Sequence, residues 1–178
     1  MPKQPIDQLI TQWIYQDYFQ YKDRPPKGNI TGIYAKALLD VAGADGVLTD
    51  AERKWVLGYA ATRGVKQEEL DALKQYKIGS EDTTAVFNND SKLKIAEHFQ
   101  AELIYDGFRA ASADGALKTR EIDSISALAK KLGMTDEKFQ ELLELYRQEE
   151  EHRQKRIELL FPKTYAEAIK AIDTHYGR

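Results

Sequence analysis

The chain has 178 residues, with 26 lysine and arginine side chains against 29 aspartate and glutamate side chains, and a formal net charge of -3. This small acidic excess argues against nucleic-acid binding, because contact with phosphate backbones requires a surplus of positive charge. The absence of cysteine excludes disulfide scaffolds, thiol nucleophiles, zinc fingers and iron–sulfur clusters.

The first segment of the chain predicts a helix rather than a targeting signal. Asp7 and Gln8 interrupt any signal-peptide core, and no stretch approaches the ~20 apolar residues that cross a bilayer. We therefore expect a cytoplasmic protein with no integral membrane segment. Apolar residues over 6–19 recur on one helical face. A helix lying on a membrane would carry Lys or Arg opposite that face, and this one carries Gln and Asp, so we expect it to pack against the core.

Helical periodicity continues along the rest of the chain. No segment alternates apolar and polar residues as a strand would, and the glycine and proline counts are low, at 11 and 5. We therefore predict an all-α fold, a helical bundle. The predicted helices cover about residues 31–44, 50–62, 67–76, 92–113, 119–132 and 135 onward, with a last amphipathic helix after Pro162.

An internal repeat relates the two halves of this bundle. A shift of 69 residues superimposes residues 41–73 on 110–142 with ten identities in 33 positions. Both copies contain an Ala-Asp-Gly-x-Leu turn, a Glu in the first turn of the next helix, and a Gly at its end. The repeat predicts two pseudo-symmetric halves with equivalent turns. We divide the chain into an N-terminal helix and loop (1–30), a helical domain (31–146, halves 31–76 and 92–146) and a charged helical extension with a C-terminal amphipathic helix (147–178).

The first turn resembles the second half of a calcium-binding EF-hand loop. Gly46 would be the sharp-turn glycine, and Glu52 the bidentate ligand. The first half of such a loop falls on Val41 and Gly43, which offer no side-chain oxygen. We therefore do not expect an EF-hand.

Helix capping is the alternative explanation for these acidic residues. Thr49 and Glu52 fit a capping box, in which each side chain bonds the other's backbone amide. The second copy has Lys118 where the box needs Ser or Thr, so capping accounts for Glu52 better than for Glu121. The functional alternative is a cation site.

If the pseudo-two-fold brings the two turns together, four carboxylates converge. An oxygen-only cluster favours a divalent cation such as Ca²⁺ or Mg²⁺ over softer metals. The predicted ligands are Asp45, Glu52, Asp114 and Glu121. Further candidates, which lie nearby in sequence or offer the one plausible nitrogen ligand, are Asp40, Asp50, Asp106 and His98.

The two turns, residues 42–54 and 111–121 with the helix that follows, resemble the paired signatures of the TerB family. This is a tellurite-resistance domain that also occurs in a membrane co-chaperone. The resemblance covers about residues 31–146. It implies an all-helical domain of two related halves, no catalytic machinery, an acidic face that binds metal ions, and a link to stress resistance.

The segment after residue 146 is charged and then apolar. Residues 147–156 contain no apolar side chain, and Glu149–Arg153 and Glu151–Lys155 have the spacing of helical ion pairs. Apolar residues return at Ile157. We expect this tail to fold back onto the domain, against the N-terminal helix. The alternative is a projecting arm for dimerisation or for docking of a protein partner.

Two functions follow from these observations. The first is a non-enzymatic module that binds a divalent cation and no organic cofactor, with a stress-resistance or scaffolding role. The second is a protein–protein interaction module whose carboxylates are structural. In that case residues 147–178 would mediate homo-oligomerisation or bind an unknown protein partner. Neither function involves nucleic acid.

Overall fold

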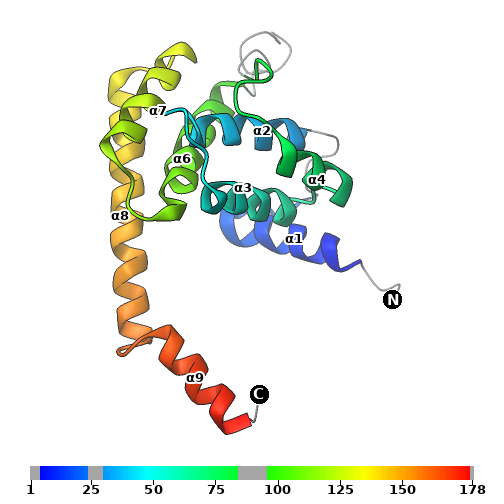
Figure 1. Ribbon diagram of the computed structural model, residues 1–178, viewed down its shortest axis with the longest axis vertical. Coiled ribbons are helices and arrows are strands. Elements are labelled where there is room, and N and C mark those ends of the chain that lie inside the picture. Colours follow the sequence, from blue (N-terminus) through cyan, green and yellow to red (C-terminus); the bar gives the residue numbers. More distant parts are fainter. Residues whose placement is uncertain (1–4, 24–29, 84–95, 177–178) are drawn as a thin grey trace.

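The computed structural model describes residues 5–23, 30–83 and 96–176. All regular elements in these ranges are helical, which confirms the all-α prediction (Figure 1). They are α1 (Ile6–Phe19), α2 (Ile30–Ala42), α3 (Asp50–Thr62), α4 (Gln67–Gln75), α6 (Ala96–Ala111), the short 3₁₀ helix η1 (Ser112–Asp114), α7 (Thr119–Lys131), α8 (Asp136–Leu160) and α9 (Tyr165–Tyr176).

Helix α6 lies at the centre of the bundle, where it packs against α2, α3, α7 and α8. Leu103, Ile104 and Phe108 on α6 are fully buried, and they form one core with apolar residues of α2, α3, α7 and α8. Helices α2 and α6 approach closely because α6 carries Gly107 at the contact. A Cβ atom at Gly107 would lie 2.3 Å from Val41 Cγ1. The two halves of the repeat thus meet through a small-residue contact.

The equivalent helices α3 and α7 end with the same geometry. Gly64 and Gly133 both have φ of +83°, a left-handed conformation that glycine adopts readily. The amide of the next residue then bonds back into the helix, Val65 N to Ala60 O at 3.1 Å and Met134 N to Ala129 O at 3.0 Å. These are Schellman caps, and they place the following helices in equivalent positions.

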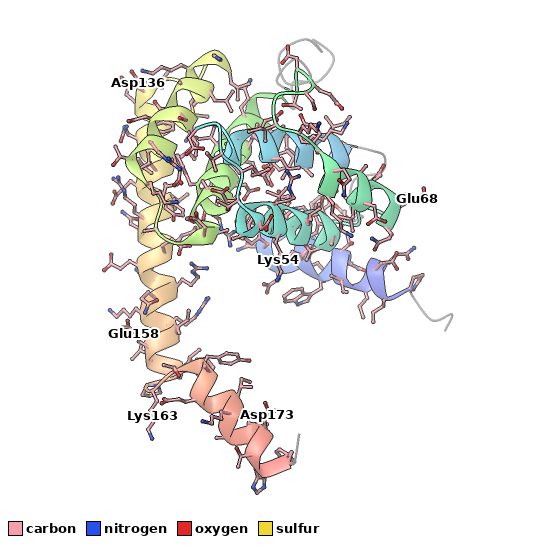
Figure 2. All side chains as sticks on the ribbon, in the orientation of Figure 1. Lys54, Glu68, Asp136, Glu158, Lys163 and Asp173 are labelled. Atoms are coloured by element: carbon pink, nitrogen blue, oxygen red, sulfur yellow. The ribbon has the colours of Figure 1, made fainter. Side chains whose placement is uncertain are left out.

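The C-terminal tail projects from the bundle instead of folding back (Figure 1). The first half of α8 buries Phe139, Leu142, Leu143 and Tyr146, and no described residue beyond Tyr146 is buried. The expectation that the tail packs on α1 is therefore wrong, and the projecting arm is observed. Residues 147–156 offer no apolar side chain that could pack on the bundle. Helix α8 therefore continues straight out, and Glu158 and Lys163 stand clear of the body (Figure 2).

Helix α1 lies along α3, with its apolar face largely exposed. Ile6 is 75% exposed and Trp13 is 59% exposed, and Thr11 is the one residue of α1 that is buried. The prediction that this apolar face packs into the core is wrong. The helix is held instead at its C-terminal end, where the Arg109 guanidinium donates to the Tyr18 hydroxyl at 2.9 Å. None of the helices in the described ranges has the length and apolarity needed to cross a membrane.

Candidate metal-binding site

The two Asp-Gly turns lie together in the folded chain. Glu52, Asp114 and Glu121 each place one carboxylate oxygen within 4.8 Å of the others. Glu52 comes from the first turn of α3 and Glu121 from the first turn of α7, while Asp114 ends η1. The fold therefore brings Glu52 of the first copy beside Asp114 and Glu121 of the second copy, which lie 62 and 69 residues further along the chain.

Helix capping positions the first of these carboxylates. The Thr49 amide donates to Glu52 Oε2 at 2.6 Å, and the Glu52 amide donates to Thr49 Oγ1 at 3.2 Å. The predicted capping box is thus confirmed. Since Oε2 accepts the cap bond, the Glu52 side chain is held with its second oxygen, Oε1, at a defined position.

Glu121 is held by one of the two hydrogen bonds of a capping box. The Lys118 amide donates to Glu121 Oε2 at 2.7 Å, so this carboxylate also caps its own helix. A lysine ammonium cannot accept a bond in return. Instead, Lys118 Nζ donates to Glu121 Oε1 at 3.1 Å and to Asp114 Oδ2 at 3.0 Å. An ammonium group therefore bridges two carboxylates of the cluster.

The cluster carries more negative than positive charge. Glu52 is 2% exposed and Glu121 is 3% exposed. Burial raises the pKa of Glu52, and the charges of Asp114 and Glu121 raise it further, while hydrogen bonds from Thr49 oppose the rise. Lys118 supplies one positive charge, and its side chain is 46% exposed. Three close carboxylates beside one half-exposed ammonium favour binding of an additional cation.

Asp45, the fourth predicted ligand, is bound in another way. Its Oδ2 forms an ion pair with Arg120 Nε at 2.8 Å, and its Oδ1 accepts a bond from the Val47 amide at 2.9 Å. Arg120 belongs to the second turn, so this pair ties the two turns together. Arg120 stands where the first copy has Ala51, and this difference between the copies was the only sequence signal for the pair.

The further candidates lie elsewhere. Asp40 accepts bonds from the Thr83 hydroxyl at 2.6 Å and the Gly79 amide at 2.8 Å, and so fixes the segment after α4. Asp50 is exposed at the start of α3. The side chain of His98 is outside the described residues. None of these joins the carboxylates of the two turns within the described part of the chain.

Asp106 is buried and belongs to a separate group that also contains the half-buried Glu102, a residue outside the two turn motifs. The Tyr34 hydroxyl donates to Asp106 Oδ2 at 3.0 Å, and the Tyr59 hydroxyl donates to Glu102 Oε1 at 3.3 Å. Burial, with a further contribution from the Asp106 charge, raises the pKa of Glu102 to about 7. The spacing of the two acids, one helical turn apart, was the only local signal for this pair.

Comparison with known proteins agrees with this architecture. The family model "Tellurite resistance protein TerB" matches residues 34–144, which is more than half of the chain. No curated protein gives a match. Among solved structures, a tellurite resistance protein from Nostoc punctiforme is 30% identical, with a TM-score of 0.78 over 91% of this chain and 98% of that one. The chain therefore belongs to the TerB family.

Proposed function

We propose that this protein binds a divalent cation between its two Asp-Gly turns, with Glu52, Asp114 and Glu121 as ligands. The observation that carries the proposal is the distance between their carboxylate oxygens, all within 4.8 Å of one another. This spacing fits ligands that share one ion, since oxygen ligands surround Ca²⁺ at roughly 2.3–2.6 Å and Mg²⁺ at roughly 2.0–2.1 Å. An all-oxygen ligand set favours these hard cations.

Lys118 competes with the cation in this proposal. Its ammonium lies 3.0 Å from Asp114 Oδ2 and 3.1 Å from Glu121 Oε1, so a metal ion at these oxygens displaces it. The side chain is half exposed and flexible, and it can swing into solvent at small cost. Replacing it with the threonine of the first repeat, Lys118→Thr, removes the competing charge and supplies a capping hydroxyl.

Calorimetric titration with Ca²⁺, Mg²⁺ and Mn²⁺ tests the proposal. We expect saturable binding by the wild type, about tenfold tighter binding by Lys118→Thr, and loss of binding in the double variant E52Q/E121Q. Glutamine retains the oxygen that caps each helix, so this variant keeps the fold. Asp50→Asn, an exposed change in the same turn of α3, is the matched control and binds as the wild type does. Absence of heat and of any change in melting temperature with all three ions contradicts the proposal.

We also propose a non-enzymatic role in stress resistance or scaffolding. The support is that the matching family and the Nostoc relative are both named as tellurite resistance proteins. The test is growth on tellurite of a host that lacks its own copy, complemented with the wild type or with E52Q/E121Q. Protection by the wild type alone supports the role, and equal growth without any copy contradicts it.

A second candidate function, self-association, is favoured by the projecting arm. Leu160 near the end of α8 is 63% exposed, and Leu145 is also exposed. Between these two leucines, residues 149–151 are all acidic and residues 153–156 carry three basic side chains. Two copies of α8 aligned antiparallel about the point between residues 152 and 153 place Glu149 opposite Arg156 and Leu145 opposite Leu160. Such a self-complementary surface suits a two-fold dimer.

Light scattering coupled to size exclusion tests this assembly. We expect a dimer for the wild type and a monomer for Leu160→Glu, because a charge replaces the apolar contact. Ile6→Glu on α1, a still more exposed apolar position outside the proposed interface, is the control and stays dimeric. A monomeric wild type over the micromolar range, or a dimeric Leu160→Glu, contradicts the assembly.

A further inference from the structure

A cavity of about 370 Å³ opens between α3, η1, the end of α6 and the middle of α8. It is separate from the carboxylate cluster, although Ser112 at its wall lies two residues before Asp114. Its lining includes three cationic side chains, Lys54, Arg109 and Arg153. Lys54 extends from α3 (Figure 2). The volume lies within the range of about 300–1,000 Å³ that is typical of small-molecule sites.

The cavity has an excess of positive charge in a chain that is acidic overall. Glu150 is the one carboxylate in its lining, and it pairs with Arg153. Among the described residues, no carboxylate forms an ion pair with Lys54 or Arg109. The cavity wall therefore carries three positive charges against the one negative charge of Glu150, and the charge of Asp106 acts on Arg109 from within α6. This balance favours an anionic ligand.

Arg109 is held in place for such a ligand. Its Nη1 donates to the Tyr18 hydroxyl at 2.9 Å, which uses one of the five N–H donors of a guanidinium. Its guanidinium carbon lies 5.5 Å from the Trp55 ring centroid, and the Trp55 ring in turn stacks on Tyr59 at 5.5 Å. A guanidinium fixed in this way loses little conformational freedom on binding, and its planar fork suits two oxygens of one phosphate.

We infer that this cavity binds a small molecule that carries a phosphate group, with Lys54, Arg109 and Arg153 as the phosphate ligands. The excess of two positive charges over Glu150 in the cavity wall matches a phosphate dianion. The volume exceeds that of a free phosphate, so the remainder of the molecule occupies space along the Trp55 and Ser112 side of the cavity. This site binds without a metal ion and does not depend on the carboxylate cluster.

Trp55 provides a direct reporter of binding. The chain has two tryptophans, and Trp13 lies exposed on α1. Trp13→Phe therefore leaves Trp55 as the only indole without disturbing the cavity. Titration of this variant with inorganic phosphate and with pyrophosphate, in EDTA and at constant ionic strength, is expected to change the Trp55 fluorescence saturably.

Variants in the same background test the assignment of residues. K54A/R153Q, at two exposed positions, is expected to weaken pyrophosphate binding at least tenfold, and Glu150→Gln to tighten it severalfold because it removes the opposing charge. Lys131→Ala, an exposed lysine at the end of α7, is the matched control and leaves affinity unchanged. The inference is overturned if neither probe gives a saturable change, or if K54A/R153Q binds as tightly as the Lys131→Ala control.

Discussion

The acidic side chains of this protein are held in two different ways. Glu52 and Glu121 are buried carboxylates whose hydrogen bonds cap their own helices. Glu102 has no such cap; it is half-buried and lies beside Tyr59 and Asp106. The repeat in the sequence pointed to the first pair because the two residues share a motif. It could not point to Glu102, whose partner Tyr59 lies 43 residues away.

Glu102 makes stability depend on pH. Burial, then the charge of Asp106, raises its pKa from 4.5 to about 7 in the folded chain. The native state therefore binds more protons than the unfolded state between these two values, so the free energy of unfolding falls as pH rises through this window and levels off above it. We expect a loss of about 1–3 kcal/mol between pH 4.5 and pH 8.

Urea denaturation of the wild type and Glu102→Gln at pH 5, 6, 7 and 8 measures this effect. The variant should have a shallower slope than the wild type, with the raised pKa values of Glu52 and Asp106 contributing the remainder, and it should be more stable than the wild type at pH 8. Glu144→Gln, an exposed position on α8, should retain the wild-type slope. A slope as steep in Glu102→Gln as in the wild type assigns the pH dependence to other groups and contradicts the prediction.

At the scale of elements, local signals located most helices well. The predicted range of residues 50–62 is the range observed for α3, because Thr49 caps its start and Gly64 follows its end. The predicted start of the next long helix at residue 92 lies outside the described residues. Local signals could not show how α1 packs on the bundle, because Thr11 of α1 lies against Gly64, which is far along the chain.

Gly64 and Gly133 are the equivalent glycines of the two halves. Alanine variants at these positions distinguish the stability cost of a left-handed backbone conformation from the cost of a steric clash. A Cβ atom at Gly64 would lie 3.2 Å from Thr11 Oγ1, whereas one at Gly133 would meet nothing within 4 Å. Both alanine variants incur the cost of a left-handed residue, about 1–2 kcal/mol. Gly64→Ala should lose roughly 1 kcal/mol more, because it pushes against α1.

Thermal and urea denaturation of Gly64→Ala and Gly133→Ala compare the two costs. The fluorescence of Trp13 on α1 should change in Gly64→Ala and remain as in the wild type in Gly133→Ala. Equal losses of stability, with unchanged Trp13 fluorescence in both, would show that α1 does not rest on Gly64.

For the whole molecule, the crossing of α2 and α6 joins the two halves. An added methyl group at Gly107 would lie 2.3 Å from Val41 Cγ1, a distance that forces the helices apart. Gly107→Ala should therefore lose about 3 kcal/mol of stability. Gly58→Ala, where a Cβ would meet nothing within 4 Å on the outer side of α3, should gain about 0.5–1 kcal/mol from helix propensity.

Urea denaturation of both variants checks this pair of predictions. The double variant V41A/G107A should recover part of the loss, because truncation of Val41 removes the clashing atom, and a double-mutant cycle measures the coupling between the two sites. A neutral Gly107→Ala, or additive effects in the cycle, would contradict the close contact.

The sequence by itself determined the helical class, most helix ends and the repeat, because periodicity, caps and turn glycines act over a few residues. It also selected the three acids that meet. The tertiary structure decided which carboxylates converge, that Asp45 pairs with Arg120, and that Lys118 lies between Asp114 and Glu121. It also decided that residues 147–176 project. These features depend on contacts between distant residues and on whether an apolar face finds a partner surface, and neither is encoded in local pattern.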